Sequence, residues 1–334
     1  MKRIDSTTLY RPLTIAMASP SDILIFGGTG FLGRHLCEYL AAKNLGATII
    51  SRNPDCAFLD DLSGNFIAKS LDELHSTARE IFSQAKTLIY LASTTLPATN
   101  HGRPWLEISQ SVEPALRIFT LASSINPLIR ILFSSSGGTV YGGSHSGPIT
   151  EDQPLKPTSA YGLGKVMLEE GLRFLGRSQG TRYAVIRLSN PVGRWQINAS
   201  HGIVNVAIQR TLAGEPITLY GGGRQWRDFL DADDVAAAIF AILQSDRWDG
   251  SVWNVGSGVG HSVTDVLDML ESLMGIRIMR KFESDRAFDI PWVVLDAGKI
   301  FKEIGWRAET TFKRSLEKIL ASHGLLAPTF YLSD

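Results

Sequence analysis

The chain has 334 residues with 33 basic and 33 acidic side chains, so its formal net charge at pH 7 is zero. This balance excludes the strongly charged surface by which many proteins bind nucleic acids or membranes. A hydrophobic content of 44% is ordinary for a globular protein with a full core. Cys37 and Cys56 lack the spacing of a metal site or a disulfide scaffold. We therefore expect a cytoplasmic protein with no bound metal and no nucleic-acid or membrane partner.

Residues 1–21 form a predicted N-terminal extension ahead of the first strand. A signal peptide needs an unbroken apolar stretch, but Arg11 and Pro12 interrupt the one present here. We expect a poorly ordered extension, with Met17 as a candidate start of the protein.

A glycine-rich turn organises the first half of the chain. Four apolar residues, Ile23–Phe26, predict a buried parallel strand, and a helix is predicted over Arg34–Lys43. The glycines between them permit a tight turn, a close approach to a pyrophosphate and close helix–sheet packing. The helix N-terminus adds free N–H groups for a phosphate. The predicted cofactor contacts of this dinucleotide site are Gly27, Gly30, Phe31, Leu32 and Gly33.

The second predicted strand, Ala47–Ile50, ends at the position whose side chains distinguish NAD from NADP in such sites. A carboxylate there accepts from the ribose 2′-OH of NAD, whereas an arginine accommodates the 2′-phosphate of NADP. Here Ser51 and Arg52 occupy the position. They favour NADP, although Arg52 can also be an ordinary solvated arginine.

Strands and helices then alternate, which predicts βαβ units and a doubly wound parallel sheet of the Rossmann type. The predicted cofactor contacts Leu91 and Ala92 lie near the end of one of these strands. The predicted strands are Phe66–Ala68, Thr87–Ser93, Ile129–Phe133 and Tyr183–Leu188. The predicted helices are Leu71–Ala85, Trp105–Ser124, interrupted near Pro114, and Pro157–Leu175.

The character of the sequence changes after residue 190. We expect a Rossmann domain over residues 22–190 and a smaller α+β lobe for the substrate over residues 191–334, with about 228–257 returning to the main sheet. The predicted elements are helices over Gly202–Leu212, Asp231–Leu243, Val263–Met274 and Phe312–Leu320, and strands over Pro216–Tyr220 and Val252–Val255.

Tyr161 and Lys165 are the candidate catalytic pair, because residues four apart lie on the same helix face. A free tyrosine is a poor base at neutral pH, but a neighbouring ammonium favours its phenolate. Such a tyrosine can remove a proton from a sugar hydroxyl and return it. Ser136, in the serine cluster before this helix, can share the substrate oxygen. A Tyr-x-x-x-Lys spacing also arises by chance, so its position one helix after the serine cluster is what favours this interpretation.

Several ordered motifs together resemble one enzyme family. They are Gly27–Gly33, Ser134–Gly142, Tyr161–Lys165, Asn190–Gly193, Gly202–Asn205, Arg227–Phe229, Asp233–Val235, Arg286–Asp289 and Leu295–Asp296. The chain resembles the extended short-chain dehydrogenase/reductases (NAD-dependent epimerase/dehydratases), and is similar to UDP-glucose 4-epimerase.

The resemblance implies Tyr161 as acid/base, Lys165 as its partner and Ser136 as the assisting hydroxyl group. It also implies that Asn190, Arg227 and Arg286 bind the nucleotide diphosphate, and guanidinium groups suit phosphate oxygens. A homodimer through the helices over 105–124 and 157–175 is a further expectation from the family.

The chain departs from the family pattern in ways that leave alternatives open. The acidic residue after the second strand is replaced by Ser51-Arg52, and Ser111 stands where the family has an asparagine. The serine segment is one residue longer than in epimerases. Counting back from Tyr141 puts Gly137 at the hydroxyl position, counting forward to Tyr161 selects Ser136, and Thr139 is the reserve candidate.

Three functions follow. The first is a 4-epimerase of a nucleotide sugar, a UDP-hexose, with NAD as a bound cofactor. The second is a reductase of a nucleotide-4-keto-sugar that uses NADPH, which Ser51 and Arg52 favour. The third is a non-catalytic dinucleotide sensor, against which the intact Tyr161 and Lys165 argue, because a binding module needs no proton donor.

Overall fold

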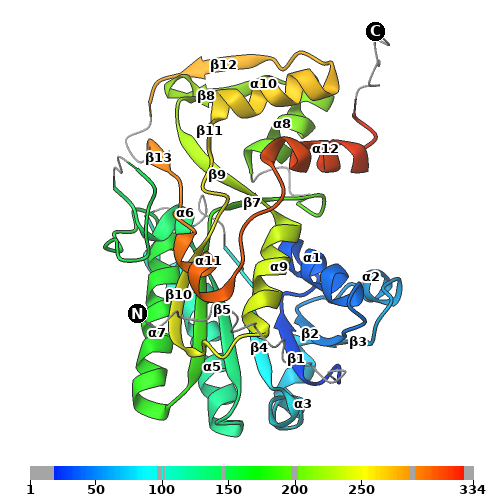
Figure 1. Cartoon of the computed structure of the whole chain (residues 1–334), viewed down its shortest axis with the longest axis vertical. Coiled ribbons are helices and arrows are strands. Elements are labelled where there is room, and N and C mark those ends of the chain that lie inside the picture. Colours follow the sequence, from blue (N-terminus) through cyan, green and yellow to red (C-terminus); the bar gives the residue numbers. More distant parts are fainter. Residues whose placement is uncertain are drawn as a thin grey trace, which may run out of the picture.

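The computed structural model describes residues 19–95, 100, 102–143, 147–196, 202–285 and 290–326. The predicted extension as far as residue 18, with Met17, and the predicted phosphate ligand Arg286 lie outside these residues. The structure has two parts, a larger lower part that contains the main sheet and a smaller upper lobe (Figure 1).

The main sheet is parallel and, in the described part of the chain, has seven strands in the order β10-β6-β5-β4-β1-β2-β3. The strand order reverses beside β1, and ligands of such sheets bind beyond the carboxyl ends of the strands at this point. The strands are β1 (Ile23–Phe26), β2 (Ala47–Ser51), β3 (Phe66–Ser70), β4 (Thr87–Tyr90), β5 (Arg130–Ser136), β6 (Arg182–Leu188) and β10 (Asp249–Val255). The predicted doubly wound Rossmann sheet is confirmed.

Helices cover both faces of this sheet (Figure 1). One face packs against α1 (Phe31–Ala41), α2 (Cys56–Asp60), α9 (Ala232–Leu243) and α11 (Gly298–Ile304). The other packs against α3 (Leu71–Gln84), α5 (Glu113–Ile125) and α7 (Ala160–Gln179). The strands are apolar on both sides because both faces of a parallel sheet are buried. Of these helices, α2 and α11 were not predicted, since one or two turns show too little periodicity.

The predicted interruption near Pro114 is confirmed. The segment consists of α4 (Pro104–Glu107), one π-helical turn (Ile108–Val112) and α5. Pro114 has no N–H to offer to the carbonyl of Gln110. That carbonyl instead accepts a hydrogen bond of 2.9 Å from Thr94 Oγ1, in the loop after β4. The interruption therefore fastens this loop to the helix.

The upper lobe has its own apolar core, which includes Val204, Leu267, Leu270 and Leu316. Its strands are β7 (Asn190–Val192), β8 (Ile217–Tyr220), β9 (Trp226–Asp231), β11 (Gly260–Ser262), β12 (Arg280–Glu283) and β13 (Trp292–Val293). Its helices are α8 (Ile203–Leu212), α10 (Val263–Met274) and α12 (Phe312–Ser322), with a 3-10 turn at Gly221–Gly223.

The return of the chain to the main sheet differs in detail from the prediction. Within the segment 228–257, α9 packs against α1 and β10 extends the main sheet. Strand β9, however, pairs with β7, β11 and β13 in the upper lobe. Farther along, Ile300, Ile304 and Trp306 also enter the core on the α1 side of the main sheet.

Candidate active site

The glycine turn brings β1, β4 and α1 into close contact. Gly27 has a positive φ of 83°, and a Cβ on it would lie 2.9 Å from the backbone nitrogen of Ala92. A Cβ on Gly33 would lie 2.2 Å from the carbonyl oxygen of Gly27. Side chains at these two positions would therefore push the turn away from β4 and α1. The predicted cofactor contact Ala92 borders the turn, and the N–H of Leu91 donates to the Phe26 carbonyl at 3.0 Å.

The first turn of α1 suits a bound pyrophosphate. Gly30 is the N-cap residue and contributes no capping side chain. The N–H groups of Phe31, Leu32 and Gly33 have no intrahelical acceptor at this helix end. Free N–H groups and the positive end of the helix dipole favour phosphate oxygens. The residues predicted from the glycine motif therefore fit a dinucleotide.

At the end of β2, Ser51 contacts the glycine turn through its hydroxyl group, which accepts from Thr29 Oγ1 at 3.2 Å. Arg34 of α1 donates to the Thr29 carbonyl at 3.1 Å and forms an ion pair of 2.5 Å with Asp55. The predicted residue Arg52 is exposed beside them. A second guanidinium, which the sequence analysis did not consider, thus lies near the position that distinguishes NAD from NADP.

Arg34 is held by more than its ion pair. Its guanidinium lies over the rings of Phe58 and Trp195, 4.4 and 4.8 Å from the two ring centroids. Such cation–π contacts fix an arginine in place. Arg34 is therefore a positioned charge rather than a freely solvated one.

Helix α7 presents Tyr161 and Lys165 as predicted. Ser159 caps the helix by accepting from the N–H of Gly162 at 3.1 Å, so the helix begins three residues later than predicted from Pro157. Lys165 is buried, and its Nζ donates to the Ser134 carbonyl at 2.9 Å. The same Nζ lies 5.4 Å from the ring centroid of Tyr161.

Burial shifts both members of this pair away from their charged forms. It lowers the pKa of Lys165 to about 8, against the opposing attraction of Glu107 and Glu169. It raises the pKa of Tyr161 to about 12, and Glu107 raises it further, while a hydrogen bond with the Ser93 side chain lowers it. In the protein alone, desolvation and the Glu107 carboxylate therefore outweigh the groups that favour the phenolate. The acid/base role of Tyr161 with Lys165 stays a prediction.

Glu107 is a residue of this site that the sequence analysis missed. It is 3% exposed at the end of α4, and its Oε1 accepts from Thr95 Oγ1 at 2.8 Å. A Cβ on Gly164 of α7 would lie 2.8 Å from Glu107 Cγ. A charged residue in the apolar run Trp105-Leu106-Glu107-Ile108 was the available signal, but the sequence does not show which helix the residue faces.

The candidate hydroxyl residues lie where β5 runs into the short helix α6 (Gly137–Val140). The side chain of Asn190 donates to the Asp228 carbonyl at 3.0 Å. A Cβ on Gly138 would lie 3.7 Å from Asn190 Oδ1 and 3.9 Å from Ser136 Oγ. The side chains of Ser136 and Asn190 therefore both lie beside Gly138. The Thr139 carbonyl instead lies against Gly162, in the first turn of α7. The choice between Ser136 and Thr139 stays a prediction.

Arg227, predicted to bind the diphosphate, lies on β9 at the junction of the two parts. Its Nη1 donates to the carbonyls of Trp226 and Ile290, at 2.8 Å each. The next residue, Asp228, is fully buried and accepts from the Ser257 backbone and hydroxyl group at 2.9 and 2.6 Å. This anchoring fixes the backbone beside Arg227.

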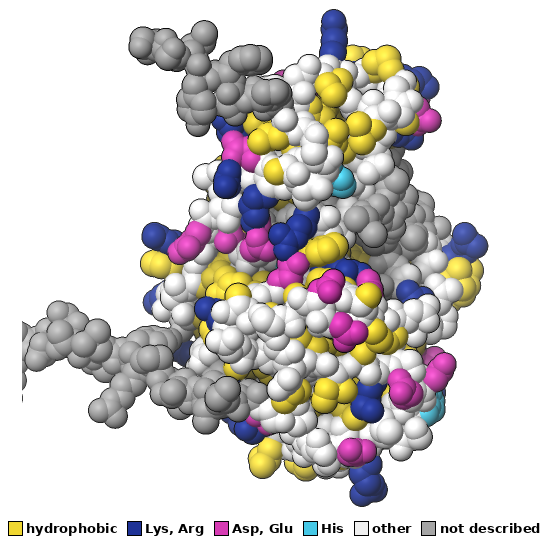
Figure 2. All heavy atoms as spheres, turned by 90° about the vertical axis from the view of Figure 1, so that its right-hand side faces the viewer, with side chains coloured by type: hydrophobic (Ala, Val, Ile, Leu, Met, Phe, Trp, Pro, Cys, Tyr) yellow, Lys and Arg dark blue, Asp and Glu magenta, His cyan; other side chains and the backbone are white. Residues whose placement is uncertain are grey.

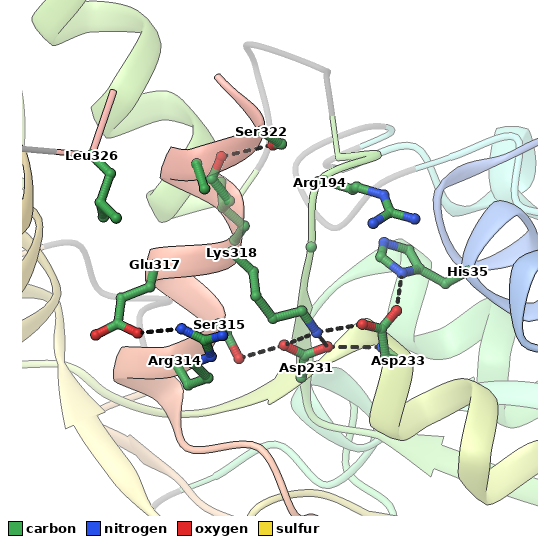
Figure 3. A pocket seen from close by; sticks show the side chains of 13 residues that line it. His35, Arg194, Asp231, Asp233, Arg314, Ser315, Glu317, Lys318, Ser322 and Leu326 are labelled. Carbon is green, nitrogen blue, oxygen red and sulfur yellow. Dashed lines mark hydrogen bonds and ion pairs between the residues drawn. The ribbon is translucent and has the colours of Figure 1, made fainter. Parts of the chain in front are cut away.

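A pocket of about 370 Å³ lies between α12, the start of α9 and α1, away from the catalytic candidates. Lys318 contacts Asp231 and Asp233, and Asp233 also contacts His35 Nδ1 at 2.6 Å (Figure 3). Charged side chains of both signs gather at the waist of this face (Figure 2). None of Ser136, Tyr161 and Lys165, all of which the structure describes, lines this pocket.

Two residues of this pocket, His35 and Asp233, belong to a possible set of metal ligands. His35, Glu38 and Asp233 offer ligand atoms within 4.8 Å of one another. Two cations already neutralise these carboxylates, since Lys318 pairs with Asp233 and Arg194 pairs with Glu38 at 2.5 Å. The cluster therefore joins α12 and the loop after β7 to the Rossmann domain.

The chain is similar to known nucleotide-sugar enzymes over most of its length. The model of the NAD dependent epimerase/dehydratase family matches residues 23–256. The UDP-glucose 4-epimerase of Bacillus subtilis is 30% identical over 90% of this chain and 94% of its own length. The dTDP-4-dehydro-6-deoxyglucose reductase of Escherichia coli is 28% identical over 91% of this chain and 98% of its own.

The chain is also similar to a solved structure. The UDP-glucose 4-epimerase of Thermotoga maritima with UDP-glucose has a TM-score of 0.81 and 25% identity, and the match covers 90% of this chain and 98% of that one. Among the described residues, no helix combines the length and the apolar character that a membrane span requires.

Proposed function

The chain belongs to the NAD-dependent epimerase/dehydratase family, and we propose that it is a nucleotide-sugar 4-epimerase acting on a UDP-hexose. The observation that supports this most is the pair of Tyr161 and buried Lys165 on one face of α7, with the Lys165 Nζ 5.4 Å from the Tyr161 ring centroid. The glycine turn that suits a nicotinamide dinucleotide lies against Ala92, in the loop after β4. When bound, the cofactor supplies the group that accepts a hydride from the sugar and returns it.

In this proposal the residues of the chain manage the proton and the orientation of the sugar. Tyr161 removes the proton of the C4 hydroxyl and gives it back after the configuration at C4 has been inverted. Lys165 keeps a positive charge near the phenol oxygen. Ser136 or Thr139 donates a hydrogen bond to the same substrate oxygen. Because the redox change is reversed within one turnover, the cofactor remains bound.

The nucleotide diphosphate has candidate ligands at the junction of the two parts. Asn190 and Arg227 come from β7 and β9, which are paired strands, so both side chains come from one small sheet. Arginine binds phosphate oxygens with charge-assisted, often bidentate hydrogen bonds. We propose that Arg227 and Arg286 bind the diphosphate and that Asn190 helps to position it.

A second candidate function rests on the end of β2. Ser51, Arg52 and the positioned guanidinium of Arg34 lie where an NAD-selective enzyme has a carboxylate. They would suit the 2′-phosphate of NADPH, which a reductase of a nucleotide-4-keto-sugar consumes. In that function Tyr161 acts only as the proton donor to the ketone oxygen.

We also propose a homodimer that forms through α4, α5 and α7. Trp105 on α4 is 60% exposed, and Leu163 and Phe174 of α7 are exposed three helical turns apart, on one side of that helix. Light scattering at several concentrations tests this proposal. A monomer at every concentration would contradict it.

One experiment separates the proposed functions. Freshly purified protein is denatured, and any released nucleotide is identified by chromatography and mass spectrometry. In parallel, conversion between UDP-glucose and UDP-galactose is followed without added cofactor. Stoichiometric NAD or NADH with conversion supports the epimerase.

An empty protein that binds NADPH far more tightly than NADH, and oxidises it with a nucleotide-4-keto-sugar, supports the reductase instead. A protein that binds a dinucleotide but turns over neither sugar would be the non-catalytic sensor. A protein that binds no dinucleotide at all would contradict all three functions.

A further inference from the structure

Glu107 is a buried carboxylate that the proposed reaction does not use. It is 3% exposed, and Thr95, its hydrogen-bond donor at 2.8 Å, is equally buried. Asn100 Nδ2 donates to the other carboxylate oxygen at 3.4 Å. Among the described residues Glu107 has no ion-pair partner, whereas the buried carboxylate of Glu169 pairs with Arg187 at 2.7 Å. A buried carboxylate without a close cation is costly, so its presence calls for a role.

The position of Glu107 is fixed by its contact with α7. The side chain lies against Gly164, where even a Cβ would be 2.8 Å from Cγ and 2.9 Å from Oε1. Tyr161, Gly164 and Lys165 share one face of α7, because residues three and four apart in a helix are neighbours. The missing side chain at position 164 thus lets a negative charge approach the face that presents the catalytic pair.

The loop after β4 connects the same groups. Tyr161 shares a hydrogen bond with the side chain of Ser93, whose own hydroxyl group donates to the Thr95 carbonyl at 2.7 Å. The Thr95 hydroxyl group then binds Glu107. One three-residue loop therefore sets the positions of the phenol and of the carboxylate.

We propose that Glu107 is a positioning residue whose negative charge keeps Lys165 as an ammonium and Tyr161 as a neutral phenol while the site holds neither cofactor nor substrate. This inference rests on the proposed acid/base role of Tyr161. Among the residues that the structure describes, the charged or titratable groups that face Tyr161 are Glu107 from α4 and Lys165 from its own helix. The negative charge of Glu107 favours the charged form of Lys165 and disfavours the charged form of Tyr161, since it stabilises the ammonium and destabilises the phenolate.

The direct test is Glu107→Gln, which keeps the shape and an oxygen for Thr95 but removes the charge. A fluorinated tyrosine placed at position 161 reports its own ionisation by fluorine NMR, without cofactor or substrate. We expect the pKa of this residue to fall by about 1 in the variant, because the negative charge that disfavours its phenolate has been removed. In the same variant, the pH at which sugar oxidation reaches half of its maximal rate should fall by the same amount.

Two further variants make the result specific. Glu107→Asp retains the charge, so it should titrate as the unaltered protein does even if the shorter side chain lowers the melting temperature. Glu113→Gln removes an exposed carboxylate of the adjoining helix α5 and should change neither readout. An unchanged titration in Glu107→Gln, or equal shifts in Glu107→Gln and Glu107→Asp, would overturn the proposal.

The design separates this inference from the proposed function. If the NMR titration shifts but no sugar is epimerised or reduced, Glu107 has its electrostatic role and the proposed reaction is wrong. If a sugar is turned over but the titration does not shift, the reaction stands and Glu107 is structural. Where Glu107→Gln fails to fold, Thr95→Val, which removes the donor that stabilises the carboxylate, should lower the pKa of position 161 by a smaller amount.

Discussion

Glu107 and Glu169 are both buried and both lie near Lys165, but their partners differ. Glu169 forms an ion pair of 2.7 Å with Arg187, and Ser135 donates to it at 2.5 Å. Glu107 accepts from the neutral groups of Thr95 and Asn100. Arg187 therefore neutralises the charge of Glu169, whereas the charge of Glu107 acts on its surroundings.

The two ends of the inward face of α7 differ in the same way. Tyr161, Lys165 and Glu169 are four residues apart in succession, so they lie in one row along the helix. At the Glu169 end, Arg187 also donates to Tyr141 at 3.0 Å, which connects β6 to the segment after α6. That end is built for stability. The Tyr161 end contains the groups that titrate without a strong partner, and such groups are typical of functional sites.

The largest expected effect is on catalysis, at the Tyr161 end. We expect Tyr161→Phe to lower the turnover of the nucleotide sugar by about 10²–10⁴-fold, because it removes the proton carrier. The melting temperature should change little. The matched control is Tyr141→Phe. It removes a hydroxyl group that donates to Asn254 at 2.6 Å, and this loss should lower the stability. If Tyr141→Phe lost activity as fully as Tyr161→Phe, the comparison between the two ends would fail.

The next effect is on stability, at the Glu169 end. Arg187→Leu leaves the carboxylate of Glu169 buried and unpaired, so we expect the free energy of unfolding to fall by about 3–5 kcal/mol. Urea unfolding followed by circular dichroism measures this loss. Arg117→Leu, which breaks an exposed ion pair with Glu113, should cost at most about 1 kcal/mol. Equal losses in the two variants would show that the buried pair has no special structural weight.

The smallest effect concerns the pH dependence of stability and sharpens the role of Lys165 between the two carboxylates. Its pKa is lowered from 10.5 to about 8 in the folded protein. Between these values the unfolded chain binds the proton and the folded protein does not, so stability rises with pH. Below about pH 8 the folded protein holds Lys165 as a buried ammonium, so the full cost of burying this charge lowers the free energy of unfolding.

Lys165→Met removes this contribution. The free energy of unfolding of the unaltered protein, relative to that of the variant, should therefore rise by at most about 2 kcal/mol between about pH 8 and about pH 9.5. That interval ends below the ordinary pKa of tyrosine, so Tyr161 does not contribute. A difference that stayed constant over the interval would mean that Lys165 titrates normally.

Much of the fold could be predicted because its signals are local. Apolar strands such as Ile23–Phe26 and periodic helices such as Val263–Met274 show their type within a few residues. The short helices α2, α6 and α11 and the strand β7 were missed, because three to seven residues show too little of any period. The segment 228–257 was expected to return to the main sheet as a whole, but its strand β9 pairs in the upper lobe, since pairing depends on strands far away in the sequence.

The sequence by itself determined the glycine turn and the alignment of Tyr161 with Lys165. Both follow from backbone geometry over a few neighbouring residues, where glycine permits a close approach and residues four apart share a helix face. Only the tertiary structure decided what surrounds the pair. Glu107 reaches α7 because two separate helices pack closely at Gly164, and Arg34 is fixed by one ring from α2 and one from the loop after β7. Burial and charge at a site depend on such long-range packing, so the pKa of Tyr161 could not be predicted from its own neighbours in the sequence.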